Sequence, residues 1–202
     1  MNNTIITGAP LTQDSKVLIM VHGRGASAQD ILSVANYLNV DGFTLIAPQA
    51  EGHTWYPLSF LAPTNNNEPH LSAALQTLDE TVKHVLSAGV TAANIYFLGF
   101  SQGACLTSEY TTRNATRYGG IVIYTGGLIG DAVDTTNYKG DFAGTPVFIG
   151  TSNPDFHVPV TRVEETVKIM EKMGANVTLK IYDGMPHTIS QDEIDATNQL
   201  MF

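Results

Sequence analysis

Two hydrophobic patterns alternate along the chain: short runs of consecutive apolar residues, and longer segments whose apolar residues recur at helical spacing. The short runs cover residues 16–21, 43–47, 94–98, 120–124, 146–149 and 177–182. Most of these runs are apolar at nearly every position, which is typical of strands covered on both faces. We therefore expect a mostly parallel central sheet that is buried between helices.

The longer segments predict five helices. They lie around residues 31–38, 71–86, 102–114 and 159–173 and from 190 to the end. Ser27 followed by Asp30 resembles a capping box, and Gly89 and Gly174 stand where two helices should end. Alternation of strands and helices predicts an α/β fold with helices on both faces of the sheet, in a single domain over 1–202.

Residues 49–68 interrupt this alternation. The stretch contains Gly52 and two prolines together with Trp55, Tyr56, Phe60 and Leu61. A loop of about 20 residues without an element of its own is more often functional than idle. Two interpretations stay open: a loop that covers a substrate site, or an Ω-loop whose apolar side chains pack on the sheet.

Composition narrows the class of protein. The 202 residues include 10 Lys and Arg against 19 Asp and Glu, a formal charge of −9, and such a chain repels nucleic-acid phosphates and anionic lipid headgroups. We expect no nucleic-acid partner, and no apolar run is long enough to span a membrane. Cys105 is the single cysteine and no leader-like segment is evident, so we expect a cytoplasmic protein without disulfides. No two histidines have zinc-binding helical spacing, so we expect no metal.

The segment 99–103, Gly-Phe-Ser-Gln-Gly, follows an apolar run and opens a predicted helix. Glycines two residues before and after a serine allow a strand to turn sharply into a helix and leave the serine hydroxyl exposed. The pattern alone is weak, but its strand-then-helix context is what a nucleophile elbow requires. We interpret Ser101 as a nucleophile.

A serine nucleophile needs a base and an acid that orients this base. His187 follows the last predicted strand, and Asp155 follows the strand before it, so the chain order is Ser101, Asp155, His187. Asp183 is the rival acid, but it stands in an Asp-Gly pair that is ordinary turn chemistry. We expect Ser101, Asp155 and His187 to form a catalytic triad.

Acyl transfer also requires N–H donors for the developing oxyanion. The segment His22-Gly23-Arg24-Gly25 directly follows a predicted strand, and Gln102 follows the nucleophile at a helix N-terminus. We expect the backbone N–H groups of Arg24 and Gln102 to form the oxyanion hole. The alternative, a tight strand-to-helix turn at His22-Gly23, is compatible with this role.

Taken together, these motifs resemble the α/β-hydrolase fold and, within it, the phospholipase/carboxylesterase family that includes the acyl-protein thioesterases. The resembling pieces are Val21–Gly25, Gly99–Gly103, Asp155–Pro159 and Gly184–His187, in the order of the family and over nearly the whole chain. The resemblance implies an α/β-hydrolase fold, a small-molecule ester substrate and no cofactor. It also implies that Trp55, Tyr56 and Leu128 lie beside the substrate, and it leaves a homodimer open.

Arg24 departs from the thioesterase branch, where an apolar residue usually follows His-Gly. The chain therefore looks more like a small bacterial carboxylesterase that cleaves small carboxylic esters through an acyl-enzyme intermediate. The alternatives within the family are a thioesterase, a lysophospholipase or a dienelactone-type hydrolase. We also hypothesise that the Arg24 side chain pairs with a polar or anionic group.

Overall fold

The computed structural model describes residues 3–202, and its centre is a seven-stranded sheet in the order β1-β3-β2-β4-β5-β6-β7. The strands are β1 (Thr4–Gly8), β2 (Val17–Val21), β3 (Thr44–Pro48), β4 (Ile95–Phe100), β5 (Gly120–Tyr124), β6 (Pro146–Asn153) and β7 (Asn176–Asp183). Every neighbouring pair is parallel except β1 and β3, which are antiparallel. The predicted mostly parallel sheet is confirmed.

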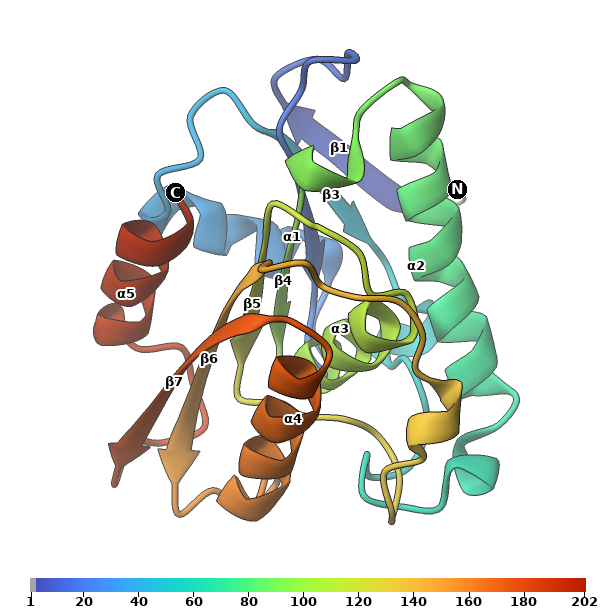
Figure 1. Cartoon of the computed structure of the whole chain (residues 1–202), viewed down its shortest axis with the longest axis vertical. Coiled ribbons are helices and arrows are strands. Elements are labelled where there is room, and N and C mark those ends of the chain that lie inside the picture. The colour runs from blue at the N-terminus through green and yellow to red at the C-terminus, as the bar shows by residue number, and fades with distance from the viewer. Residues whose placement is uncertain (1–2) are drawn as a thin grey trace.

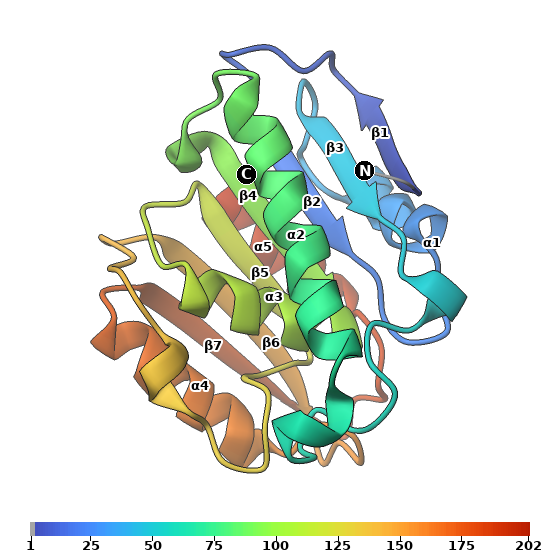
Figure 2. The same cartoon turned by 90° about the vertical axis from the view of Figure 1, so that its right-hand side faces the viewer.

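Five α-helices cover the two faces of this sheet (Figures 1 and 2). They are α1 (Ala28–Ser33), α2 (His70–Ser87), α3 (Gln102–Arg113), α4 (Val160–Lys172) and α5 (Gln191–Met201). Helices α1 and α5 lie on one face, and α2, α3 and α4 lie on the other. Gly89 and Gly174, just after α2 and α4, have φ of +91° and +85°, the left-handed conformation that glycine adopts at helix ends.

The sheet is apolar on both faces because each face packs against helices. In β2, Ile19 belongs to the hydrophobic cluster under α2, α3 and α4, whereas Leu18 and Met20 belong to the cluster under α1 and α5. All five residues of β2 are fully buried. This two-sided burial explains why the strands appear in the sequence as apolar runs rather than as alternating patterns.

Strand β1 (Thr4–Gly8) was not predicted from the sequence. It lies at the edge of the sheet beside β3, and its residues are half-buried or exposed. Antiparallel pairing with a buried neighbour forms this strand, and its own sequence has no continuous apolar run to indicate it.

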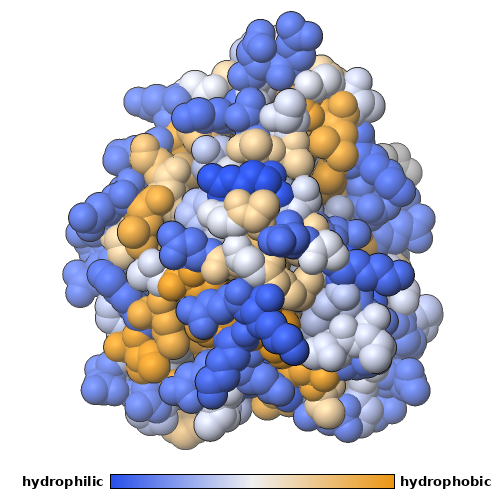
Figure 3. Space-filling model, in the orientation of Figure 1, coloured by the Kyte–Doolittle hydropathy of each residue, from blue (hydrophilic) through white to orange (hydrophobic). Residues whose placement is uncertain are grey.

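The face of the molecule seen in Figure 1 is mostly hydrophilic. Figure 3 shows one face, on which hydrophobic residues form separate small patches among hydrophilic ones. Within residues 3–202, no helix combines the length and the hydropathy that crossing a membrane requires.

Candidate active site

Ser101 lies in the sharp turn between β4 and α3, at the carboxyl end of the sheet. Its φ and ψ are 54° and −118°, a conformation that non-glycine residues rarely adopt and that often marks a functional site. A Cβ atom at Gly99 would lie 2.5 Å from the Gly103 carbonyl oxygen, and one at Gly103 would overlap the carbonyl oxygens of Val21 and His22. The two glycines therefore permit the close packing of α3 against the strands that holds this turn.

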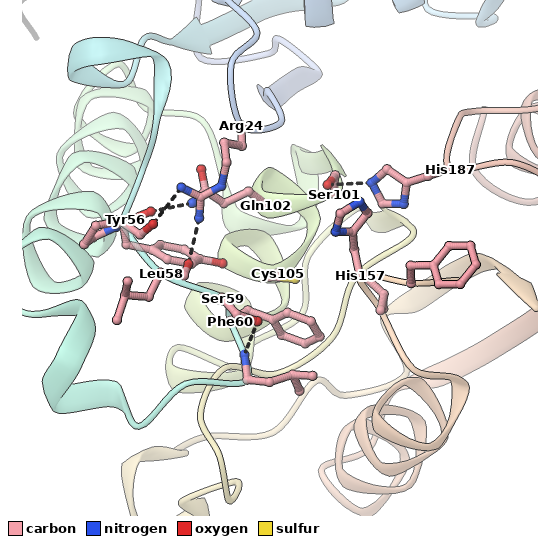
Figure 4. A pocket seen from close by; sticks show the side chains of 14 residues that line it. Arg24, Tyr56, Leu58, Ser59, Phe60, Ser101, Gln102, Cys105, His157 and His187 are labelled. Atoms are coloured by element: carbon pink, nitrogen blue, oxygen red, sulfur yellow. Dashed lines mark hydrogen bonds between the residues drawn. The ribbon is translucent and has the colours of Figure 1, made fainter. Parts of the chain in front are cut away.

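The structure brings Ser101, His187 and Asp155 into one chain of hydrogen bonds. Ser101 Oγ lies 2.8 Å from His187 Nε2, and His187 Nδ1 lies 2.7 Å from Asp155 Oδ2 (Figure 4 shows the first of these contacts). The three residues follow β4, β6 and β7, whose parallel order gathers their carboxyl ends at one edge of the sheet. In this arrangement Nδ1–H donates to the carboxylate, and Nε2 accepts the serine proton.

The Asp155 side chain is fully buried and every oxygen has a partner. Oδ1 accepts the backbone N–H groups of His157 and Val158 at 2.7 and 2.9 Å, and Oδ2 also accepts the Ser152 hydroxyl at 2.9 Å. Burial alone would raise the pKa of this carboxyl, but the hydrogen bonds from His187, His157, Val158 and Ser152 outweigh burial and lower it. Asp155 is therefore an anion oriented toward His187.

The rival acid Asp183 lies at the end of β7 and does not contact His187. Its carboxylate accepts only a long bond of 3.4 Å from the Asn153 amide. Asp155 is the carboxylate that the fold sets against the histidine.

The two predicted oxyanion donors are the backbone N–H groups of Arg24, after β2, and of Gln102, directly after the nucleophile. Among residues 3–202, the backbone N–H groups of Arg24 and Gln102 have no hydrogen-bond acceptor. Gln102 is the first residue of α3, where backbone N–H groups lack intrahelical partners. Both donors are therefore free for an oxyanion at Ser101.

The Gln102 side chain holds the 49–68 loop next to the nucleophile turn through hydrogen bonds. Its Nε2 donates to the Tyr56 carbonyl at 2.7 Å, and its Oε1 accepts the Trp55 backbone N–H at 2.9 Å. The Trp55 indole then donates to the His22 carbonyl at 2.8 Å. One glutamine thus bridges the nucleophile turn and the loop.

The Arg24 guanidinium also binds the 49–68 loop through hydrogen bonds. It donates to Thr54 Oγ1 at 3.0 Å, to the Pro57 carbonyl at 2.9 Å and to the Leu58 carbonyl at 2.7 Å. Figure 4 shows the guanidinium above Tyr56 and Leu58, with its bonds directed into the loop. The Arg24 guanidinium thus bonds to three groups of the chain itself, and its hypothesised pairing with a polar or anionic group of the ester stays a prediction.

His22 supports the oxyanion segment as a buried neutral imidazole. Its Nε2 accepts the Ala50 backbone N–H at 3.1 Å, and its Nδ1 lies 2.7 Å from the Gly23 carbonyl. This pattern requires a proton on Nδ1 and none on Nε2. Burial lowers the pKa of His22, so the neutral form is favoured.

A pocket of about 750 Å³ opens at Ser101, within the range of small-molecule sites. Its lining comes from the 56–61 segment, the nucleophile turn and the 156–158 segment, with a few further side chains. The lining residues are Arg24, Tyr56, Pro57, Leu58, Ser59, Phe60, Leu61, Ser101, Gln102, Cys105, Phe156, His157, Val158 and His187. In the 49–68 loop, Tyr56 and Phe60 are buried in the core and also border the pocket. The interpretation that the loop covers a substrate site stays a prediction.

Two residues expected beside the substrate do not line this pocket. Trp55 is buried behind it with its indole on the His22 carbonyl, so its role is structural support. Leu128 is fully buried, and its backbone is bonded to Thr166 Oγ1 and to the Arg162 guanidinium at 3.0 Å each. These bonds tie the loop after β5 to α4.

Sequence reasoning missed Phe156 and His157 as pocket residues. Both follow Asp155, and Phe156 is 98% exposed. The only feature of the sequence that could have indicated their place in the pocket is the aromatic residue directly after the predicted acid. Cys105 also borders the pocket, but burial raises its pKa to about 12, so it is a neutral thiol and a poor nucleophile.

The described residues 3–202 contain no group of three His, Cys, Asp or Glu side chains positioned to hold a metal ion. The absence of a cofactor stays a prediction, as do the cytoplasmic location and the homodimer.

Comparisons with known proteins agree with this architecture. The model of a family described as Phospholipase/Carboxylesterase matches residues 2–201. A crystal structure of a phospholipase/carboxylesterase from Dyadobacter fermentans DSM 18053 is 52% identical with a TM-score of 0.96, and the match covers 98% of this chain and 95% of that one. The predicted α/β-hydrolase fold is confirmed.

Curated relatives are more distant. A probable SOBER1-like carboxylesterase of Arabidopsis thaliana is 23% identical over 144 residues, which cover 70% of this chain and 55% of that protein. Acyl-protein thioesterase 1 of Saccharomyces cerevisiae is 27% identical over 124 residues, which cover 60% of this chain and 55% of that protein. The matches thus span little more than half the length of these two relatives.

Proposed function

Because the chain belongs to the phospholipase/carboxylesterase family, we propose that it is a serine hydrolase that cleaves small carboxylic esters through an acyl-enzyme intermediate. The observation that supports this function most directly is the continuous hydrogen-bonded chain from Asp155 through His187 to Ser101. Ser101 and His187 line a pocket, and the backbone N–H groups of Arg24 and Gln102 have no hydrogen-bond acceptor among residues 3–202.

In the first step, Ser101 Oγ attacks the ester carbonyl carbon while His187 Nε2 takes the serine proton. The carbonyl oxygen becomes an oxyanion, which the N–H groups of Arg24 and Gln102 stabilise. Asp155 stabilises the imidazolium that forms on His187. The tetrahedral intermediate then collapses, and His187 gives its proton to the departing alcohol oxygen.

In the second step, water attacks the acyl-enzyme and His187 takes a proton from this water. A second tetrahedral intermediate collapses, Ser101 Oγ leaves with the proton from His187, and the carboxylic acid is released. The acyl group occupies the pocket between Tyr56, Phe60 and Leu61. Since each methylene changes selectivity by only about 1–3 kcal/mol, we expect turnover of several short esters.

A thioester is the second candidate substrate, because the yeast relative is an acyl-protein thioesterase. The same nucleophile, base and oxyanion donors serve both reactions. The leaving group is then a thiol instead of an alcohol.

The test is initial rates on p-nitrophenyl esters from acetyl to palmitoyl and on an acyl-CoA thioester, with Ser101→Ala beside the wild type. We expect turnover concentrated on the short esters and a loss of about 10⁴-fold or more in Ser101→Ala. Circular dichroism shows whether the variant keeps its fold. Folded wild type without turnover of any of these substrates would exclude the proposed function.

A further inference from the structure

One imidazole beside the proposed triad has no role in holding the fold. Within the part of the chain that the structure describes, neither ring nitrogen of the exposed His157 has a hydrogen-bond partner. By contrast, His22 and His53 each bond a backbone carbonyl, of Gly23 and Ala26 respectively. The His157 ring is therefore free to bind a ligand.

The backbone holds this free ring beside the reacting groups. The His157 N–H donates to Asp155 Oδ1 at 2.7 Å, which ties the residue to the acid. The His157 ring lies 5.1 Å from the His187 ring, tilted by 65°. Figure 4 shows the His157 ring beside the bonded Ser101 and His187 side chains, on their pocket side.

The pocket has positive and polar groups but no accessible carboxylate. No Asp or Glu is among its lining residues, and the ionisable side chains with the potential for positive charge are Arg24, His157 and His187. The nearby Asp155 side chain is 0% exposed and already accepts four hydrogen bonds. An anion in this pocket therefore meets donors and no exposed negative group.

We propose that His157 recognises the leaving group, and that the preferred ester has a carboxylate on its alcohol portion. This inference rests on the proposed hydrolase function, in which His187 hands its proton to the leaving oxygen. The leaving alcohol must then lie against His187 and within reach of the neighbouring His157 ring. An imidazole N–H donates to a carboxylate, and protonation adds a charge to that bond.

The formal charge of −9 does not cancel this local attraction. At physiological ionic strength, exposed charges more than about 8 Å apart are largely screened, whereas a direct hydrogen bond acts at contact. The pocket residues therefore decide the preference once the ester has arrived.

A matched pair of esters isolates the carboxylate. The probes are 3-acetoxybenzoate and its neutral amide, 3-acetoxybenzamide, which share the acyl group and the ring. Each kcat/KM is divided by the rate of spontaneous hydrolysis of the same ester, and the readout is the ratio of the two normalised values. We expect wild type to prefer the anionic ester about fivefold, because a hydrogen bond to a carboxylate is about twice as strong as one to a neutral amide.

Three variants assign the preference to His157. His157→Ala keeps the backbone N–H to Asp155, and we expect its ratio to fall to about one. His157→Lys replaces the imidazole N–H by ammonium N–H donors, and we expect at least about threefold preference. His84→Gln, an exposed histidine of α2 outside the pocket, is the matched control and is expected to keep the wild-type ratio.

The inference is overturned if wild type shows no preference for the anionic ester, or if His157→Ala keeps the preference. In either case, turnover of the neutral amide ester that disappears in Ser101→Ala leaves the hydrolase function standing. Absence of Ser101-dependent turnover of both probes and of the p-nitrophenyl panel would overturn both proposals together.

Discussion

The two walls of the pocket are built differently. The fixed wall consists of residues 56–58 together with Arg24 and Gln102, and hydrogen bonds of Arg24 and Gln102 hold this wall and the preceding Thr54 and Trp55 in place. The open wall consists of residues 156–158, in which the backbone N–H groups of His157 and Val158 are bonded to Asp155, while Phe156 is 98% exposed and the His157 ring has no hydrogen-bond partner within residues 3–202.

The comparison distinguishes side chains that are held by hydrogen bonds within the protein from side chains that remain free to contact a ligand. The polar groups of the fixed wall that bond to Arg24 and Gln102 find their hydrogen-bond partners within the protein. These hydrogen bonds hold the segments that supply the backbone donors for the proposed oxyanion hole. The open wall uses its backbone to orient the acid; Val158 is buried in the core, whereas the exposed side chains of Phe156 and His157 contribute little to the fold. Changes in the fixed wall should therefore affect stability and turnover together, whereas changes in the open wall should affect the choice of substrate.

Gln102→Ala is the strongest test of the fixed wall. It removes the partners of the buried Trp55 N–H and of the Tyr56 carbonyl, and each unsatisfied group costs about 1–3 kcal/mol. We expect the free energy of unfolding to fall by about 2–4 kcal/mol. In a chain of this size, each kcal/mol lowers the midpoint of thermal unfolding by about 2–4 °C.

Gln102→Glu is its matched control. The carboxylate still accepts the Trp55 N–H, but it places a negatively charged oxygen against the Tyr56 carbonyl in a buried site, so we expect a midpoint at least as low as that of Gln102→Ala. An unfolding midpoint of Gln102→Ala equal to that of wild type would show that this wall does not depend on the glutamine.

Arg24→Leu tests whether the guanidinium holds the loop or binds substrate. Loss of the bonds to Thr54, Pro57 and Leu58 should let the loop shift, and small displacements of positioning groups reduce rates strongly. We expect kcat/KM to fall about tenfold for both 3-acetoxybenzoate and 3-acetoxybenzamide, with their ratio unchanged.

Arg24→Lys separates charge from geometry, because an ammonium group cannot reproduce the planar fork of the guanidinium. We expect the lysine variant to resemble Arg24→Leu. A selective loss of the anionic ester in Arg24→Leu, restored in Arg24→Lys, would instead mean that the Arg24 charge binds substrate.

The sequence was sufficient to predict six of the seven strands and the five α-helices. It also singled out Ser101, Asp155 and His187, which the fold brings into hydrogen-bond contact, while their catalytic role stays a proposal. Buried parallel strands produce continuous apolar runs, and the chemistry requires a serine in a glycine-flanked turn and a histidine after a later strand. Both signals are local in the chain. The edge strand β1 lacks such a signal because its pairing with β3 depends on a distant segment.

The lining of the pocket was less predictable, because it depends on the directions of side chains. Tyr56 lines the pocket while the adjacent Trp55 turns behind it, and no periodic pattern in a loop distinguishes the two. Leu128 is drawn toward α4 by bonds to Thr166 and Arg162, which lie more than 30 positions away in the sequence. Contacts of this kind appear only once the chain is folded.

The fixed wall should also respond to acid through His22. Burial places its folded pKa below the ordinary value of 6.5, so below pH 6.5 the unfolded chain binds more protons than the folded chain. The contribution of neutral His22 to stability is complete above pH 6.5 and declines as the pH falls below it. We expect the unfolding midpoint to drop more between pH 8 and pH 5 in wild type than in His22→Gln, whose side chain does not titrate. Parallel pH profiles of the two proteins would contradict this assignment.

Phe156→Ala should produce the smallest effect and tests the open wall directly. Since the ring is 98% exposed, its removal deletes almost no buried contact, and we expect the free energy of unfolding to change by less than about 0.5 kcal/mol. Its position among the pocket residues lets it pack on an aromatic leaving group, so KM for phenyl acetate should rise about two- to threefold, a loss of about 0.5 kcal/mol.

Ethyl acetate, which has no ring to pack, is the control substrate and should show a smaller change. Leu86→Ala, at an exposed apolar residue of α2 outside the pocket, is the control variant and should leave the KM of both esters unchanged. A fall in the unfolding midpoint of Phe156→Ala, with unchanged KM for phenyl acetate, would mean that the open wall supports the fold and that the two walls do not differ in the way described.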